Sequence, residues 1–166
     1  LITGATNAVT LALGANPGGG TLGGTLTVSA SGGIATFPGL SLDNAAAGYT
    51  LAASAAGLAG ATSAAFDVTP GAPTNLAFGQ QPTSTTGGAS LAPAVTVLVR
   101  DANGNTVTGS TAAVTIAIGT NPGSGTLGGT LTVNAVAGVA TFADLTIDKA
   151  GTGYTLSAAA AGVSGV

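Results

Sequence analysis

The sequence predicts an all-β chain built from antiparallel β-sandwiches, and three observations support that prediction. Apolar residues alternate with small or hydroxyl residues in many short segments, which is the period of a half-buried strand. Glycine, proline and asparagine separate these segments, as expected for turns between strands. Residues 1–61 align without a gap with residues 106–166, an offset of 105, and 37 of the 61 aligned pairs are identical. The chain therefore contains an internal repeat.

Alternating apolar side chains predict the first strands at residues 9–13 and 26–28, and the second copy repeats them at 114–118 and 131–133. Valine, isoleucine, leucine and threonine dominate these segments, and β-branched residues suit the pleated surface of a sheet. Asn-Pro-Gly and Gly-Gly sequences lie between the two strands of each copy. A loop is therefore expected between them.

Further strands of the first copy are expected at 34–37, near 49–51 and at 66–68, where apolar residues again alternate or cluster. Between the last two lies an alanine-rich segment, residues 52–61, whose composition has helical propensity. Two glycines interrupt this segment, and the preceding strand runs directly into it. We therefore predict that it is extended rather than helical.

The sequence Pro70-Gly71-Ala72-Pro73 predicts a short, stiff joint between two domains, because proline removes ladder donors and restricts the backbone. We expect residues 1–70 to be the C-terminal part of one repeat, without its first strands. Residues 71–166 are then the next repeat, without its last strand. The simplest interpretation is a window cut from a longer repetitive polypeptide.

After the joint, strands are expected at 76–78 and 95–99, where apolar residues alternate. The pair Asn103-Gly104 follows, and Asn-Gly between two apolar alternations is the strongest short-range signal of a hairpin turn. Arg100 is expected to lie in the preceding strand.

Charged residues make up 4% of the chain, whereas about 25% is usual for globular proteins. With only two cations and a net charge of −3, the chain has no basic patch that could neutralise phosphates, so nucleic acid is excluded as a partner. No apolar run reaches the roughly 18 residues of a membrane-spanning helix, so membrane insertion is not expected. Cysteine is absent, which excludes disulfides.

The composition argues against an enzyme. Histidine, cysteine and glutamate are missing, and the five aspartates are scattered along the chain, so no nucleophile has a base beside it. We assign no catalytic residue and expect no cofactor. The glycine-rich segment 18–20 lacks the lysine and helix of a phosphate-binding loop.

The sequence contains one weak candidate for a calcium site. Asp101, Asn103 and Asn105 place three oxygen ligands at alternate positions, as at the start of a calcium loop. However, the glycine stands fourth rather than sixth, and no bidentate acid follows, so a hairpin turn is the favoured interpretation. Asp144 and Asp148 form a second, weaker oxygen pair, and the lysine beside them argues against a cation there.

About seven short strands in about 100 residues are typical of an immunoglobulin-like antiparallel sandwich. Asp148, Gly153 and Tyr154, with Leu156 two residues on, resemble the tyrosine corner of such folds. Alternatively, Tyr49 and Tyr154 are ordinary amphipathic strand residues. In either case we expect both tyrosines to contribute to packing.

One pattern extends through the chain, and it comprises Leu76-Ala77-Phe78, Gln81-Pro82, Val95-Thr96-Val97, Asp101-Ala102-Asn103-Gly104-Asn105, Ala140-Thr141-Phe142 and Gly153-Tyr154-Thr155-Leu156. This pattern resembles the tandem bacterial Ig-like repeats of large secreted and surface proteins, and in outline it is similar to invasin/intimin-type repeats. The resemblance covers essentially the whole chain. It implies an extracellular or cell-surface location, because members of that group serve mostly as stalks, spacers and adhesive surfaces. It implies an architecture more firmly than an activity.

Two hypotheses of function follow. The first is a structural repeat module of a bacterial extracellular stalk, fibre or sheath, assembling head to tail with copies of itself or with adjacent repeats. The alternative is an adhesin-type binding module that engages glycan or a host surface. Glycan recognition commonly uses exposed aromatic rings, and the chain has two tyrosines and four phenylalanines, most of them expected in the core. The structural hypothesis is therefore favoured.

Overall fold

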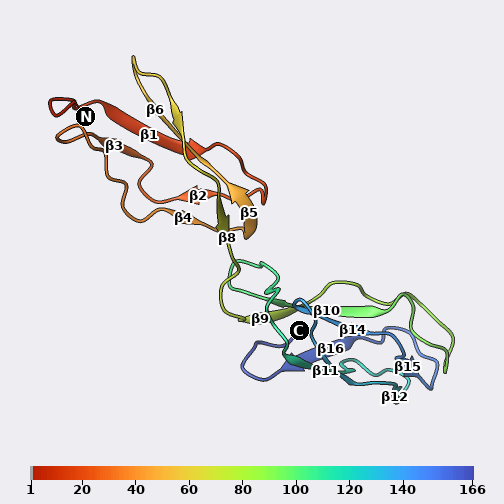
Figure 1. Ribbon diagram of the computed structural model, residues 1–166. Coiled ribbons are helices and arrows are strands. Elements are labelled where there is room, and N and C mark those ends of the chain that lie inside the picture. Colours follow the sequence, from red (N-terminus) through yellow and green to blue (C-terminus); the bar gives the residue numbers. More distant parts are fainter. Residues whose placement is uncertain (1) are drawn as a thin grey trace. The chain divides into compact units, whose positions relative to one another are not determined.

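The computed structural model describes residues 2–166, and every regular element in that part of the chain is a β-strand (Figure 1). The strands pair antiparallel, so the predicted all-β fold class with antiparallel sandwiches is confirmed. The chain divides into two compact units; unit 1 ends at Thr69 and unit 2 is Pro70–Val166. A helix long and apolar enough to cross a membrane is not found among the described residues.

Unit 1 contains a four-stranded sheet of order β3-β1-β6-β7 and two smaller pairs, β2 with β4 and β5 with β8. Its strands are β1 (Ala8–Leu13), β2 (Leu22–Gly23), β3 (Thr27–Ser29), β4 (Ser41–Leu42), β5 (Ala46–Tyr49), β6 (Leu51–Ala55), β7 (Ala61–Thr62) and β8 (Phe66–Val68). The alanine-rich segment 52–61 is extended, with a turn between β6 and β7, so the expectation that it is not helical is confirmed.

The strand expected at 34–37 does not form. Ile34 makes a single bridge to Ser31 and is 57% exposed, and residues 35–37 belong to no strand. The equivalent residues of unit 2 form a strand because another strand pairs with them through contacts such as Val97↔Ala140. Within the described residues nothing pairs with 35–37 in this way, and unpaired backbone has no ladder to hold it extended.

Unit 2 contains two three-stranded sheets, of order β14-β10-β9 and β13-β11-β16, and the pair β12–β15. Its strands are β9 (Asn75–Phe78), β10 (Val95–Arg100), β11 (Ala113–Ile118), β12 (Leu127–Gly128), β13 (Thr132–Asn134), β14 (Val139–Phe142), β15 (Thr146–Ile147) and β16 (Leu156–Ala160). The strands predicted at 76–78 and 95–99 are confirmed, and Arg100 ends β10 as expected.

The core of unit 2 lies between its two three-stranded sheets. Every second residue of β10 faces inward, so Val95, Val97 and Val99 are fully buried. β11 supplies alternate residues from the opposite sheet. The largest buried side chains of this core are Phe142, Ile116, Leu145, Val95, Val97, Val99 and Val114. This alternation on facing sheets is the arrangement of a sandwich.

Unit 1 has the same apolar pattern with far less burial. Val9 and Leu11 of β1 are only partly buried, whereas their counterparts Val114 and Ile116 in β11 are buried. Among the large apolar side chains described in unit 1, Tyr49 alone is fully buried. The difference arises because the β10 strand packs over the equivalent face only in unit 2.

The turn predicted at Asn103-Gly104 forms, and Gly104 adopts the left-handed φ of +85° that the turn requires. The returning arm is short, however. It pairs with β10 through the single bridge Arg100↔Thr106 and through a hydrogen bond from the Val107 N–H to the Val99 carbonyl. The predicted hairpin is therefore a tight turn with one bridge rather than two full strands.

Candidate functional site

Asp101 accepts four hydrogen bonds through its carboxylate, and the residue is 2% exposed. Its Oδ1 accepts hydrogen bonds from the backbone N–H groups of Asn103 at 3.0 Å and Asn105 at 2.9 Å. Its Oδ2 accepts from the Gly71 N–H at 2.8 Å and from Asn105 Nδ2 at 3.0 Å. The Asn105 side chain and the Gly71 N–H lower the pKa of Asp101 from 3.8 to about 2, because they stabilise its charged form.

These contacts describe a hydrogen-bonded turn. Four N–H donors surround the Asp101 carboxylate, and a calcium ion would need oxygen ligands in their place. Asn105 directs its amide nitrogen, not its oxygen, toward the carboxylate. No group of three or more metal-ligating His, Cys, Asp or Glu side chains gathers anywhere in residues 2–166. The weak calcium site at Asp101, Asn103 and Asn105 stays a prediction, without support from this donor geometry.

The other four aspartates also bind the backbone of a separate segment. Each accepts a hydrogen bond from a main-chain N–H: Asp43 from Thr21 at 2.6 Å, Asp67 from Gly48 at 2.9 Å, Asp144 from Thr130 at 3.0 Å and Asp148 from Thr126 at 2.6 Å. The Thr21 contact lowers the pKa of Asp43, and the Thr130 contacts lower that of Asp144. All five carboxylates therefore tie separate backbone segments together, and Asp67 does so between two paired strands, β8 and β5.

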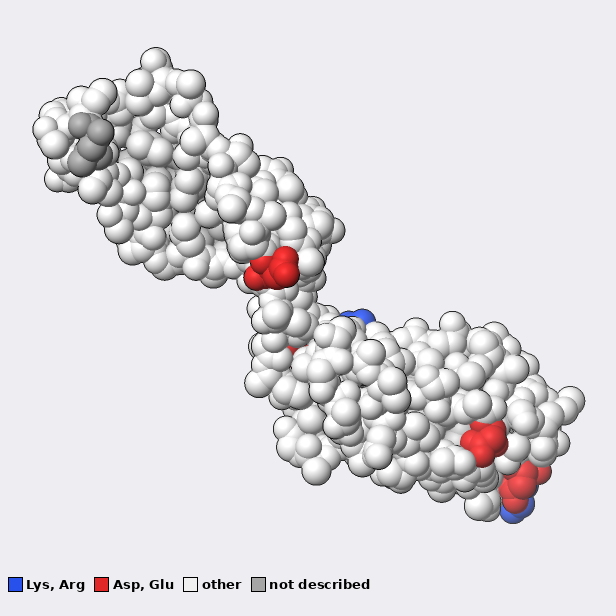
Figure 2. All heavy atoms as spheres, viewed as in Figure 1, with Lys and Arg blue, Asp and Glu red and all other residues white. Residues whose placement is uncertain are grey.

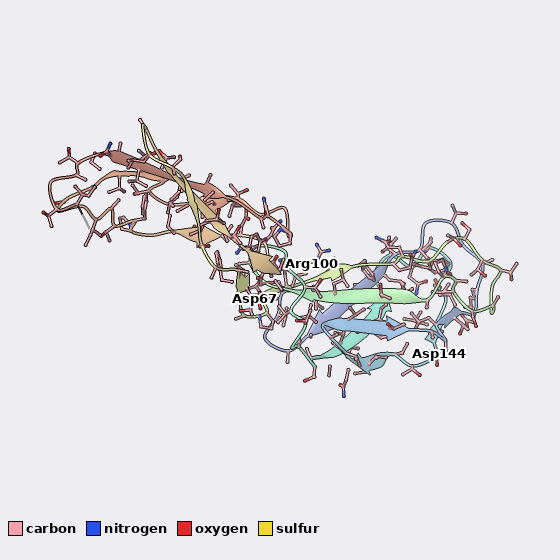
Figure 3. The ribbon with its side chains drawn as sticks, turned by 45° about the horizontal axis from the view of Figure 1, so that its top comes forward. Asp67, Arg100 and Asp144 are labelled. Carbon is pink, nitrogen blue, oxygen red and sulfur yellow. The ribbon has the colours of Figure 1, made fainter. Side chains whose placement is uncertain are left out.

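The few charges do not gather into a reactive cluster. Figure 2 shows a surface on which Asp, Lys and Arg atoms are sparse. Within unit 2, Arg100 and Asp144 lie at opposite ends, as Figure 3 shows. This follows from the topology, because Arg100 ends β10 whereas Asp144 follows β14, its antiparallel neighbour.

The two tyrosines occupy equivalent positions. The Tyr49 hydroxyl donates to the Asn44 carbonyl at 2.8 Å, and the Tyr154 hydroxyl donates to the Lys149 carbonyl at 3.0 Å. A hydroxyl bound to backbone a few residues upstream is the contact of a tyrosine corner. A Cβ at Gly18 would collide with the Tyr49 hydroxyl, which explains a glycine at that position.

The loop before each second strand is also built twice in the same way. The Asn16 side chain donates to the Gly20 carbonyl at 2.9 Å and accepts from the Gly20 N–H at 2.8 Å. Asn121 makes the same two bonds with Gly125, each at 2.8 Å. The carbonyl and the NH2 of the asparagine amide thus bond the backbone in place of a backbone turn, which suits the Asn-Pro-Gly sequence.

A groove is found in each unit, and the groove of unit 2 is lined by polar and apolar residues alike. The groove of unit 1 has a volume of about 460 Å³ and is lined by residues of β4, β6 and β8, among them Leu42, Leu51 and Phe66. The groove of unit 2 has a volume of about 410 Å³ and lies between the segments 82–91 and 147–156. Sequence analysis did not identify either groove, although equivalent leucines, Leu51 in unit 1 and Leu156 in unit 2, line both.

Aromatic rings do not form an exposed platform in either unit. Of the six aromatic residues, all of them described, Tyr49 and Phe142 are buried and Phe66 is the most exposed at 37%. Phe37, Phe78 and Tyr154 are partly buried. A row of exposed rings for stacking on sugars is therefore not found in residues 2–166.

No protein-family model matches the chain, and no curated protein matches it. Among solved structures, it is similar to a β-glycosidase from Bacteroides vulgatus, at 16% identity and a TM-score of 0.48. It is also similar to a β-glucuronidase from Parabacteroides merdae, at 12% identity and a TM-score of 0.45. Each alignment covers 97% of this chain and 20% of the other chain. Likenesses at this level assign no activity to the chain.

Proposed function

We propose that the chain is a structural repeat module of a bacterial extracellular stalk, fibre or sheath, without a catalytic role. One observation carries this proposal: all five carboxylates of the chain accept hydrogen bonds from backbone N–H groups. A catalytic acid needs a reacting partner and a suitable pKa within a cleft. Here the acids bind backbone N–H groups, and for three of them the contacts lower the pKa and favour the charged form.

The longest strand pairs support the same role. β1 pairs with β6 from Val9↔Ala55 to Leu13↔Leu51, and β11 pairs with β16 over the equivalent five residues. Each unit thus has its own continuous antiparallel ladder, and the register is the same in both. A chain of units built to one plan suits a serial spacer, in which each unit is stabilised mainly by itself and its neighbours.

Assembly with copies of itself or with adjacent repeats is part of the proposal. The half-exposed apolar face of unit 1 and its groove are surfaces that a neighbouring segment covers in such an assembly. Few charges oppose that contact, since the whole chain has two cations and five acids. The resemblance to tandem bacterial Ig-like repeats supports the extracellular or cell-surface location.

Single-molecule force spectroscopy of the intact chain tests the structural role. Unit 2 is expected to unfold in one cooperative event that lengthens the chain by about 300 Å, at roughly 3.5 Å per extended residue. A spacer must hold its fold under load, so unfolding of unit 2 in many small steps at negligible force would contradict the proposal.

A glycan-array screen provides the second half of that test. The structural role predicts no specific signal, because the described residues contain no row of exposed aromatic rings. Reproducible binding to one class of sugar would replace the structural proposal with the adhesin-type alternative.

A further inference from the structure

Unit 1 shows how its last strand is held. β8 pairs with β5 through Ala46↔Val68 and Tyr49↔Phe66, with an irregularity between the two pairs. The Phe66 ring stacks on Tyr49, with ring centroids 6.2 Å apart and planes inclined by 29°. Asp67, between the two paired residues, accepts a hydrogen bond from the Gly48 N–H at 2.9 Å. Under this strand Tyr49 has no exposed surface.

Unit 2 contains the counterpart of β5, but within the described chain no strand pairs with it. Residues 151–154 are the counterparts of β5, and in the described chain they belong to no strand. Their backbone is already arranged as in unit 1, because Gly153 has a φ of +88° and Gly48 one of +87°. Tyr154 keeps its hydroxyl bond to the Lys149 carbonyl, yet its ring is only partly buried.

The groove of unit 2 lies along residues 151–154. Its apolar lining includes Leu91, Ile147, Tyr154 and Leu156, and the backbone of residues 151–153 forms one side. Residues 151–153 are exposed and belong to no strand, so their backbone is open to a partner. Exposed, unpaired backbone beside a groove with apolar side chains is the arrangement that binds an added β-strand.

The last residues of unit 2, 158–166, also pair as their counterparts do in unit 1. Ala158 and Val166 exchange two backbone hydrogen bonds, of 2.6 and 3.0 Å. These residues are the counterparts of Ala53 and Ala61, which pair between β6 and β7. Residues 158–166 therefore pair in the same register as the segment of unit 1 that leads into β8.

We propose that the groove of unit 2 is an acceptor site for an extended strand of the β8 kind, with the order aromatic, aspartate, aliphatic. The aromatic ring packs on Tyr154, the aspartate accepts from the Gly153 N–H, and the aliphatic residue pairs with Gly151. Lys149 also lines the groove and attracts the aspartate of the incoming strand. This inference rests on the proposed structural role, since a neighbouring repeat is the donor.

A synthetic peptide tests the site directly. The peptide has the sequence of residues 62–69, Thr-Ser-Ala-Ala-Phe-Asp-Val-Thr, and is titrated to millimolar concentration into the isotopically labelled intact protein. We expect the amide signals of residues 151–154 to shift in a saturable manner. Hydrogen exchange at these amides is expected to slow by about tenfold, because a paired edge is protected.

Two altered peptides are matched controls. Replacing the phenylalanine by alanine removes the ring that packs on Tyr154, and N-methylation at the phenylalanine and valine blocks backbone pairing without changing the side chains. Both are expected to lose at least tenfold in affinity. If the N-methylated peptide or free phenylalanine binds as well as the original, the groove is a small-ligand pocket and the proposal is wrong.

Joining the peptide covalently to the protein allows the site to be tested even if the free peptide binds weakly. The same eight residues are added after Val166, which places the phenylalanine at the distance it has from Ala61 in unit 1. Unit 2 is expected to melt at a higher temperature, whereas a scrambled extension leaves it unchanged. No shift with the peptide and no gain on tethering would overturn the acceptor site. The force and glycan measurements on the unextended chain test the proposed function separately.

Discussion

Asp101 and Gly71 are joined by a hydrogen bond of 2.8 Å across 30 residues of chain. The bond runs from the Gly71 N–H, in the proline-flanked segment that begins unit 2, to the carboxylate in the turn after β10. The same carboxylate accepts from Asn103 and Asn105. One buried charge therefore fixes both a turn and the start of the unit.

The stability of unit 2 is expected to depend on pH through Asp101. Its pKa is about 2 in the folded chain, below the ordinary 3.8. A lowered folded-state pKa contributes stability that is complete above pH 4 and is lost as the pH falls toward 2. Thermal unfolding of the wild type and of Asp101→Asn, measured between pH 2 and 6, checks this. The variant is expected to melt lower at pH 6, and the two melting curves should converge toward pH 2; a constant gap would contradict the assignment.

Replacing Ala137 by glycine is expected to stabilise unit 2. Ala137 has a φ of +50°, in the left-handed region that costs a residue with a Cβ about 1 kcal/mol. Its counterpart in unit 1 is Gly32, with a φ of +59°. Ala137→Gly removes about 1 kcal/mol of strain, and the backbone entropy of glycine offsets part of that. The free energy of unfolding should therefore rise by roughly a few tenths of a kcal/mol. Urea unfolding measures the change.

The reverse substitution in unit 1 is the matched control. Gly32→Ala introduces a Cβ at a left-handed position where no atom lies within 4 Å of it. The strain exceeds the unfolded-chain entropy that alanine removes, so the stability of unit 1 should fall by roughly a few tenths of a kcal/mol. If both substitutions change stability in the same direction, backbone strain is not the cause.

Equivalent phenylalanines are expected to differ in their importance. Phe142 is 1% exposed in the core of unit 2, so Phe142→Ala should cost about 3–5 kcal/mol. Its counterpart Phe37 is partly buried and lies outside any strand, so Phe37→Ala should cost about 1 kcal/mol, the centre of the range for point substitutions. Chemical unfolding of each variant gives the two values, and equal costs would show that unit 1 has a core as well packed as that of unit 2.

Trypsin is expected to cut the folded chain after Lys149 first. Lys149 and Arg100 are its two cations; Lys149 is exposed in the loop after β15, whereas Arg100 ends β10 and is half-buried. Proteases cut accessible, unpaired backbone much faster than backbone in a sheet. Mass spectrometry of a time course identifies the first product, and Lys149→Gln should make the folded chain resistant. Early cleavage after Arg100 would mean that β10 opens readily.

Local patterns predicted most of the strands, because alternation reports which face of a segment is apolar. They failed at 34–37 for a reason outside that segment. Ala35-Thr36-Phe37 is identical to Ala140-Thr141-Phe142, yet only the second forms a strand, since β10 pairs with it. Whether a segment becomes a strand therefore depends on a partner that its own sequence does not contain.

The loops were predictable in kind but not in their contacts. Spacing identified Asp101, Asn103 and Asn105 as a group, but it could not tell whether an asparagine presents its oxygen or its nitrogen. In the structure Asn105 presents nitrogen, and the group becomes a turn. The recurrence of Asp43 at Asp148 was visible in the sequence, whereas the partners Thr21 and Thr126 were not, because they lie 22 residues away.

The matching registers of the two units also affect how the chain reaches its fold. β1 pairs with β3 and β11 with β13, and in both pairs two threonine hydroxyls are hydrogen-bonded across the strands, at 3.0 and 2.9 Å. Because the sequences are so similar, β1 can accept β13 with the same contacts that it makes with β3. Exchange of equivalent elements is a common error of repeat proteins during folding. We therefore expect refolding yield to fall as protein concentration rises, with molecules linked by exchanged strands that each satisfy every local contact.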